Sequence, residues 1–191
     1  MDTLLQLIIV AAVAVSPAIT KWAKDKIKKT GQAFSKNLRI RAEIAAIVKE
    51  IQIRFDANRV AIFEYSNTEK AINGLPFDYV TMTYEETAHY TAPIGHSMRK
   101  MPIGQFAAIL MEIDQANKWV QHTLNHPNVD VVYNLKSYDV VMEYHFKITN
   151  HLRDGVLSIV FMKETPDFTP EQIDYINFKC WEIYQLMKKL K

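Results

Sequence analysis

Cysteine and glycine are scarce in this chain of 191 residues, and their scarcity excludes several classes of protein. The single cysteine, Cys180, rules out a disulfide within the chain and any zinc site built from several thiolates. It is compatible with a reducing compartment. With only 5 glycines and 7 prolines, long flexible linkers are not expected. Apolar residues make up 49% of the chain and charged residues 23%, a composition typical of a folded globular protein.

The sequence also lacks the short motifs that carry catalysis. It has no G-x-S-x-G nucleophile turn, no P-loop, no G-x-G-x-x-G and no H-E-x-x-H. His122 and His126 are four residues apart, a spacing that binds a metal only when a third ligand arrives, and we interpret them as a surface pair. Cys180 fits as a small hydrophobic residue of a terminal helix. We therefore expect no enzymatic activity, no cofactor and no metal site.

Positive charge is concentrated at the start of the chain. Residues 1–41 hold eight Lys/Arg and two Asp, a balance of +6, whereas residues 42–191 hold fifteen Lys/Arg and nineteen Asp/Glu, a balance of −4. Contacts to phosphate need Lys and Arg on the folded body. The mildly acidic remainder therefore argues against a nucleic-acid partner.

The N-terminal segment predicts a membrane anchor over residues 1–22. Residues 4–19 carry no charge, and counting from Thr3 to Trp22 reaches the length of about 20 residues that a transmembrane helix needs. The residues expected in the membrane include Leu4, Leu5, Ile8, Ile9 and Val10, with Trp22 at headgroup depth. The residues expected to face anionic lipid are Lys21, Lys24, Lys26, Lys28 and Lys29.

Two other interpretations of this segment remain open. A cleaved signal peptide normally starts with a positive region, which Met1-Asp2 is not, and a buried or interfacial helix is the second alternative. If the segment spans a membrane, the positive-inside rule keeps the lysines in the cytoplasm. We then expect a single-pass protein of the bacterial inner membrane, with a basic juxtamembrane segment over residues 23–35 and a cytoplasmic domain over residues 36–191.

The remaining sequence predicts an α+β domain. Apolar residues at spacings of three and four predict helices over 36–55 and 105–124. Strands are expected at 59–65, 78–87, 129–133, 138–148 and 156–162, with turns at Asn73-Gly74 and at 153–155. The alternation in 138–148 indicates a half-exposed strand, with His145 on the solvent side. Thr169, Pro170 and Gln172 form a capping box that begins a last helix.

Three stretches of this domain resemble GAF domains, in particular the small membrane-anchored GAF-like proteins of bacteriophages. The stretches are "ANRVAIFEYSN", "GLPFDYVTMTYEET" and "GVLSIVFMKE", and the resemblance covers residues 38–189. Ser66 and Thr68 depart from the His and Gly that the family often has after its first strand. The resemblance implies an antiparallel sheet covered by helices, a pocket on one face, and a binding role without catalysis. The tetrapyrrole-binding cysteine pattern is missing, because Cys180 falls in the last helix.

The predicted pocket lies where the first two strands end. The residues expected to line it are Tyr65, Asn67, Met82, Tyr84 and Glu85, which offer hydrogen bonds and an aromatic stacking surface. The alternative is that Asn67 only caps a turn and that Glu85 is solvated. The expected partners are the membrane and a small molecule or protein ligand. Phe178, Trp181 and Tyr175 suggest a homodimer face on the last helix, and a core contact on two sides of that helix is the alternative.

A weaker similarity connects the chain to the single-span holin of T-even phages, which has one transmembrane helix and a soluble α/β domain. That protein carries its basic residues before its span, whereas here they follow it. The sequence thus favours a membrane-anchored, non-catalytic GAF-like sensory or binding module, with a phage lysis protein as the alternative.

Overall fold

The computed structural model describes residues 2–66, 78–149, 155–163 and 167–190, and it leaves the side chains of residues 2–20, 23, 27 and 29 outside that description. The chain divides into two units, Met1–Arg41 and Ala42–Lys191. One helix, α1 (Asp2–Arg54), makes up nearly all of the first unit and continues into the second. It includes the helix expected over residues 36–55.

The N-terminal unit exposes the aromatic and basic side chains predicted to flank a membrane. Trp22 is exposed, and Lys26 Nζ lies 4.9 Å from the centre of its ring. Lys21, Lys24 and Lys28 are also exposed. In the part of the chain whose side chains are described, no helix is long and apolar enough to cross a membrane. The anchor residues from Leu4 to Val10, and the side chain of Lys29, lie outside that part, so the anchor over residues 1–22 stays a prediction.

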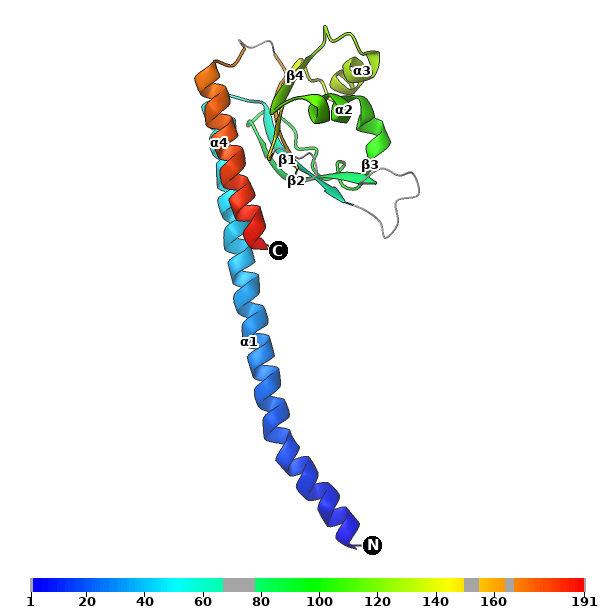
Figure 1. Ribbon diagram of the computed structural model, residues 1–191, viewed down its shortest axis with the longest axis vertical. Coiled ribbons are helices and arrows are strands. Elements are labelled where there is room, and N and C mark those ends of the chain that lie inside the picture. The colour runs from blue at the N-terminus through cyan, green and yellow to red at the C-terminus, as the bar shows by residue number, and fades with distance from the viewer. Residues whose placement is uncertain (1, 67–77, 150–154, 164–166, 191) are drawn as a thin grey trace. The chain divides into compact units, whose positions relative to one another are not determined.

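The second unit is built on one antiparallel sheet of six strands (Figure 1). Along the sheet the strands follow the order β3-β2-β1-β6-β5-β4. Their bounds are β1 (Arg59–Ser66), β2 (Tyr79–Thr87), β3 (Met101–Pro102), β4 (Trp119–Thr123), β5 (Met142–Lys147) and β6 (Val156–Phe161). Strand β1, which was expected at 59–65, lies between β2 and β6 near the middle of the sheet.

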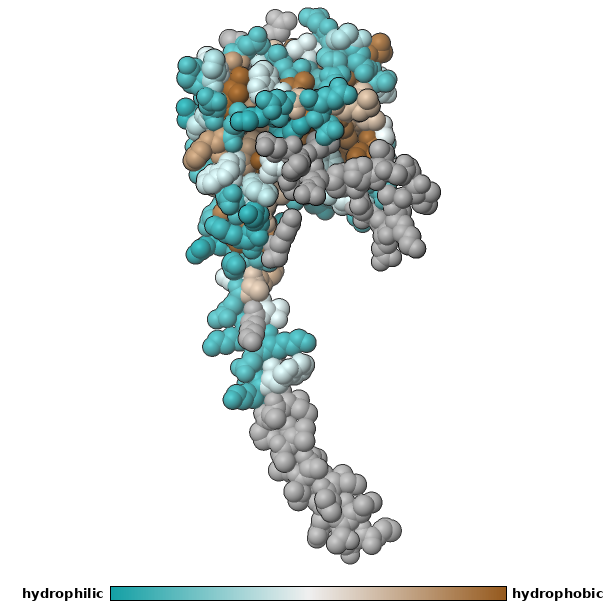
Figure 2. Space-filling view, viewed as in Figure 1, coloured by the Kyte–Doolittle hydropathy of each residue, from teal (hydrophilic) through white to brown (hydrophobic). Residues whose placement is uncertain are grey.

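Helices cover both faces of the sheet, which gives a three-layer α+β domain (Figure 1). Helix α4 (Pro170–Met187) and the end of α1 lie on one side. Helices α2 (Ala107–Gln115) and α3 (Val129–Ser137) lie on the other, with the short 3-10 helix η1 (Ile103–Phe106) before α2 and η3 (Lys188–Leu190) after α4. Because β-strand side chains alternate, each central strand contributes to both interior layers. The outer surface seen in Figure 2 is mainly hydrophilic.

The layer beneath α4 is apolar and aromatic. Tyr144 of β5 stacks on Phe168 with ring centroids 4.2 Å apart, and the fully buried Phe146 and Phe161 lie around the same ring. The helix itself begins as predicted, with a capping box formed by Thr169 and Gln172. Burying aromatic side chains of this size contributes much of the stability of a small domain.

The helix predicted over residues 105–124 is wrong in its second half. Helix α2 ends at Gln115, and Trp119–Thr123 form the edge strand β4, which pairs with β5. Val120 and Leu124 lie four apart, which imitates a helical stripe. A strand is favoured instead by the aromatic Trp119 and the β-branched Thr123, which lie with Gln121 on one face when the segment is extended.

The strand predicted over residues 129–133 is also wrong, because this segment begins helix α3. Asn128 is its N-cap, and the Asn128 side chain accepts a hydrogen bond from the backbone N–H of Asp130 at 2.9 Å. The buried Val131 and Leu135 are four residues apart and face the same side of the helix. The N-cap at Asn128 therefore favours a helix here more strongly than the β-propensity of the valines favours a strand.

Strand β5 is shorter than predicted, and its polar face is not exposed. Glu143, His145 and Lys147 alternate to one side as expected, but that side lies beneath other elements, with His145 5% and Lys147 7% exposed. Lys147 Nζ donates a 2.7 Å hydrogen bond to the carbonyl oxygen of Asp114 near the end of α2. The prediction that His145 faces solvent is therefore wrong, because α2 covers the face on which it lies.

Two predicted turns fall partly or wholly outside the described residues. Asn73-Gly74 lies in the segment 67–77, and of the turn at 153–155 only Gly155 is described. Gly155 has a φ of 106°, a conformation that other residues rarely adopt. A Cβ added there lies 2.9 Å from the carbonyl oxygen of Phe63, so glycine is also required by the close approach of β1.

A candidate ligand cavity with a polar wall

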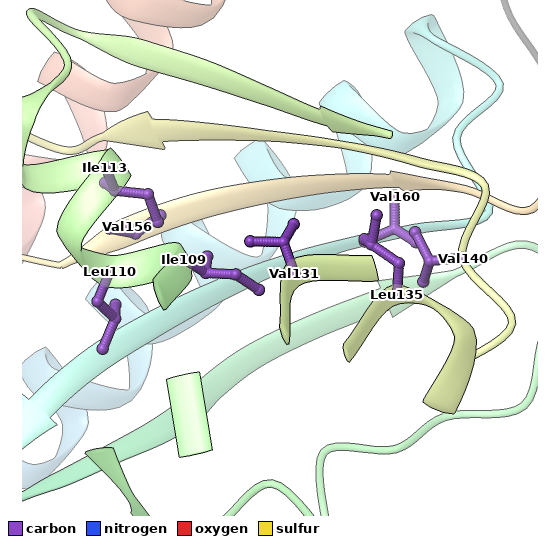
Figure 3. Packing of buried hydrophobic residues seen from close by; sticks show 8 residues of the cluster. All are labelled: Ile109, Leu110, Ile113, Val131, Leu135, Val140, Val156 and Val160. Carbon is purple, nitrogen blue, oxygen red and sulfur yellow. The ribbon is translucent and has the colours of Figure 1, made fainter. Parts of the chain in front are cut away.

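A cavity of about 70 Å³ lies between the sheet and helices α2 and α3. Figure 3 shows the residues that pack between these layers, including Ile109 and Leu110 from α2, Leu135 from α3 and Val160 from β6. The remaining lining is mainly apolar and comes from β1, β2 and the loop before β3, through Ala61, Phe63, Val80, Met82, Ile94 and Met98.

One part of the cavity wall is polar. Glu143, His145 and Ser158 lie next to one another on β5 and β6 and line the cavity, and Ser158 is fully buried. Ser158 Oγ donates a short hydrogen bond to Glu143 Oε1, and His145 Nε2 lies 3.2 Å from the same oxygen. Buried polar groups in a folded protein are normally paired in this way, because an unpaired one costs several kcal/mol. The wall is thus satisfied internally and still presents polar atoms to the cavity.

The surroundings of Glu143 keep its carboxylate ionised. Burial by itself raises the pKa of this carboxyl group, but the adjacent His145, and the hydrogen bonds from His145 and Ser158, outweigh burial and lower the pKa to about 2. A fixed negative charge therefore lies at the edge of an apolar cavity. Such a group favours ligands that bring a hydrogen-bond donor.

The polar wall continues away from the cavity as a chain of side chains. His145 Nδ1 lies 3.2 Å from Nδ1 of His122, a fully buried residue of β4. His122 Nε2 lies 3.0 Å from Glu112 Oε2 on α2, and His126 Nε2 lies 3.0 Å from that same oxygen. Burial, followed by the closeness of His145, lowers the pKa of His122 to about 4, so the His122 imidazole is neutral at pH 7.

The loop that covers the other end of the cavity is held by Glu85. Its two carboxylate oxygens accept hydrogen bonds of 2.8 Å from the backbone N–H groups of Ile94 and Gly95. Arg59 Nε donates to Glu85 at 3.0 Å, and Arg59 Nη2 donates to the carbonyl oxygen of Ala92. Both side chains are almost completely buried, at 4% and 11% exposure, which makes these charge-assisted bonds strong.

The predicted pocket residues divide among several roles. Met82 lines the cavity, and Glu85 acts at its rim by positioning the loop 88–100. Tyr65 packs partly buried against the cluster beneath α2, and burial raises its pKa above the ordinary value. Tyr84 is half-buried on β2 and is not among the cavity-lining residues. Asn67 lies outside the described residues.

The sequence does not indicate the polar wall. It predicts His145 on the solvent side of its strand, and His122 and His126 as a surface pair. Instead the pair belongs to β4 and the turn after it, where the His126 N–H donates to the Thr123 carbonyl oxygen at 3.1 Å. His122 of β4 and His145 of β5 lie on the same face of the sheet, and this shared face would have indicated a buried polar cluster. Recognising it requires knowing that residues 119–123 form a strand that pairs with β5.

Three of these side chains also form a group able to hold a metal ion. Glu112, His122 and His126 each offer one ligand atom, and the three atoms lie within 4.8 Å of one another. They come from three places in the chain, namely α2, β4 and the turn after β4. This is the third ligand that the histidine spacing alone lacked.

Comparison with known proteins identifies the fold. No family model matches the sequence, and no curated protein matches it. The blue-light absorbing form of the PixJ GAF domain from Thermosynechococcus elongatus superposes with a TM-score of 0.61 at 14% identity, covering 81% of this chain and 88% of that one. The GAF domain region of a putative membrane protein from Geobacter sulfurreducens gives a TM-score of 0.61 at 9% identity, with coverages of 82% and 98%.

A third solved structure, the phycoerythrobilin-bound GAF domain of a cyanobacterial phytochrome, gives a TM-score of 0.59 at 12% identity and covers 83% of this chain and 95% of that one. At such identities the likeness shows the fold and leaves ligand and activity open. The six-stranded sheet, the helices on both faces and these superpositions agree: this chain contains a domain with the GAF-like fold.

Proposed function

We propose that this chain is a sensory module that binds a compact small molecule in the cavity of its GAF-like domain and acts by binding rather than by catalysis. The observation that carries the proposal is the polar wall of Glu143, His145 and Ser158 in a mainly apolar cavity, whose lining also includes Arg59 and Asn134. A mainly apolar pocket with a few converging polar groups is the usual form of a small-molecule site.

The size of the cavity supports a compact ligand. Its volume of about 70 Å³ is well below the roughly 300–1,000 Å³ of pockets for drug-sized ligands. The similar cyanobacterial phytochrome domain is named for its bound phycoerythrobilin, a molecule far larger than this cavity. The one cysteine here is buried in α4 and is not among the residues that line the cavity. We therefore propose a small, mainly apolar ligand with a donor group directed at Glu143, in place of a covalently attached chromophore.

A ligand screen on the full chain tests this proposal. Compact alcohols, amines and free nucleobases are compared with cyclic nucleotides and bilins by thermal shift and then by calorimetry. Ala61 lines the cavity and is 1% exposed, so Ala61→Leu fills the space and is expected to abolish binding of any hit. Ala46→Leu is the matched control on an exposed position of α1. Equal binding by wild type and Ala61→Leu, or no hit among the compact compounds, would overturn the proposal.

We also propose that residues 1–22 anchor the module in a membrane, with the domain on the cytoplasmic side. The proposal is supported by the uncharged run at 4–19 and by the exposed lysines and Trp22 that follow it. One similar structure comes from a putative membrane protein. Full-length protein is expected in the carbonate-resistant membrane fraction. Protease added to spheroplasts should leave residues 30–191 intact, and digestion of that region would show the opposite orientation.

A further inference from the structure

The side chains of Glu112, His122 and His126 meet at one point beside the sheet. Glu112 Oε2 lies 3.0 Å from His122 Nε2 and 3.0 Å from His126 Nε2. The two imidazole rings stand at 72° to each other with centroids 5.3 Å apart, so their Nε2 atoms approach the carboxylate from different directions. The three ligand atoms lie within 4.8 Å of one another, a spacing that suits a single metal ion.

We propose that Glu112, His122 and His126 bind a divalent transition metal ion of the zinc class. Two imidazole nitrogens and one carboxylate oxygen are ligands that Zn²⁺ prefers, and three protein ligands leave a fourth position for water or another exchangeable group. With metal–ligand bonds of about 2.0–2.1 Å at tetrahedral angles, neighbouring ligand atoms stand about 3.3 Å apart. The two 3.0 Å separations at Glu112 need only small side-chain shifts to reach that value.

The partners of His122 support the proposal independently of this spacing. A histidine that ligates through Nε2 carries its hydrogen on Nδ1 and normally donates it to a neighbouring group that fixes the ring. His122 Nδ1 lies 3.2 Å from His145 Nδ1, and His145 in turn reaches Glu143, which Ser158 holds. This gives a buried outer shell running from the metal ligand to a carboxylate. A pair of surface histidines needs no such support.

Metal binding is expected to break one hydrogen bond of His126. The Nδ1 atom of His126 accepts a 3.1 Å hydrogen bond from the backbone N–H of Asn128. The hydrogen of a neutral His126 then sits on Nε2 and points at Glu112. Ligation through Nε2 moves that hydrogen to Nδ1, so the Asn128 N–H must release this bond. The Asn128 amide is therefore a reporter of metal binding that lies outside the ligand set.

The site is accessible from outside without passing through the cavity. His126 and Glu112 are 16% and 29% exposed at their side chains, whereas His122 is fully buried. An ion can therefore reach the carboxylate and the outer histidine first. Glu112, His122 and His126 are not among the residues that line the cavity, so failure of one proposal leaves the other standing.

Titration with Co²⁺ tests the proposal on the full-length chain, produced without a histidine tag, purified in detergent and treated with chelator. We expect one equivalent of Co²⁺ to give the intense visible absorption of a tetrahedral or five-coordinate site, and Zn²⁺ to displace it. His126→Ala and Glu112→Gln should each weaken binding by more than tenfold. His89→Ala, which removes an exposed histidine elsewhere, should leave it unchanged.

Two further readouts separate ligation from a general loss of structure. Glu143→Gln leaves all three ligands in place and is expected to weaken Co²⁺ binding by about tenfold, with folding checked by circular dichroism. The amide resonance of Asn128 should shift on metal addition in wild type. No visible absorption with Co²⁺, or equal affinity in wild type, His126→Ala and Glu112→Gln, would overturn the proposal and leave the three residues as a hydrogen-bonded group only.

Discussion

The two faces of strand β5 are both buried, yet they differ completely in chemistry. On one face Tyr144 and Phe146 pack with Phe168 beneath α4. On the other face Glu143 and His145 contact Ser158 and His122 beneath α2. Burial therefore does not by itself mark the hydrophobic core of this domain. The aromatic face gains stability from area removed from water, whereas the polar face has to pair every group it buries.

The two faces of β5 differ in what burial does for the free energy of folding. Apolar side chains on the α2 face would have been buried at a lower cost in free energy, because a buried charge destabilises the fold unless it is paired and hydrogen-bonded. The polar chain from Ser158 to His126 instead connects the cavity to the outside. We infer that the α4 face holds the domain together and that the α2 face carries the binding chemistry. Substitutions on each face test this division.

Truncating an aromatic residue on the α4 face should have the largest effect. Phe146 is fully buried, so Phe146→Ala is expected to lower the free energy of unfolding by about 3–5 kcal/mol, measured by urea denaturation. Phe178→Ala, at a side chain that is 54% exposed, serves as the control and should change it by less than about 0.5 kcal/mol. A loss below about 1 kcal/mol for Phe146→Ala would refute the assignment of this face to stability.

The charge of Glu143 should make stability depend on pH in the acid range. Its pKa is about 2 in the folded protein and near 4.5 when unfolded, so its ionised form stabilises the fold above about pH 4.5, and this stabilisation is lost as the pH falls toward 2. The difference corresponds to about 3 kcal/mol. Between pH 7 and pH 2 the free energy of unfolding should therefore fall less in Glu143→Gln than in wild type.

The control for this experiment is Asp174→Asn, which removes an exposed carboxylate on α4 and should keep the wild-type acid dependence. Each variant is denatured with urea at several values between pH 2 and pH 7. If Glu143→Gln shows the same acid dependence as wild type, the carboxylate is not held by His145 and Ser158 as described.

Loosening the rim of the cavity should have an intermediate effect. Glu85→Gln removes the charge from the bonds to Ile94, Gly95 and Arg59 and is expected to cost about 1.5–3 kcal/mol. The amide hydrogens of Ile94 and Gly95 should also exchange faster with solvent. Glu86→Gln, at the next position along β2, is the control. Unchanged exchange at both amides in Glu85→Gln would show that Glu85 does not hold the loop.

The smallest effect on stability is expected from the outer surface of α4. Phe178 and Trp181 stack on each other with ring centroids 5.9 Å apart and are both exposed, and the homodimer face expected there stays a prediction. Tyr175, the third residue of that predicted face, donates a hydrogen bond to Glu50 of α1 and is half-buried. Trp181→Ala should reduce self-association in analytical ultracentrifugation and change the free energy of unfolding by no more than about 0.5 kcal/mol. Tyr133→Ala, exposed on α3, is the control, and equal masses for wild type and Trp181→Ala would exclude this interface.

The sequence predicted those parts of the fold that local signals determine. The strand at β1 was recognisable from its continuous apolar run, and α4 from its capping box, because both depend on neighbouring residues only. The errors at 119–123 and 129–133 arose where two local signals compete. At 119–123, the spacing of four between Val120 and Leu124 resembles a helical pattern, although the segment is a strand. At 129–133, the cluster of valines resembles a strand, although the N-cap at Asn128 begins a helix.

The site was harder to predict than the fold, because its residues meet only through long-range pairing. Of the predicted pocket residues, Met82 lines the cavity, whereas Glu85 holds the loop 88–100 and is not among the lining residues. The burial of Glu143, His145 and His122 follows from the packing of α2 over β4 and β5, which no local pattern contains. Alternation along β5 correctly separated its two faces, but alternation cannot say which face another helix will cover.

The most direct test of the cavity as the functional site uses methionine methyl groups labelled with ¹³C in the full chain. Met82 and Met98 line the cavity, whereas Met111 is 61% exposed on α2 and provides a control within the same sample. Compact compounds with a hydrogen-bond donor are added while the methyl resonances are followed. The account predicts that a binding compound shifts Met82 and Met98 in parallel and leaves Met111 in place. Shifts confined to Met111, or no response to any compact compound at Met82 and Met98, would contradict it.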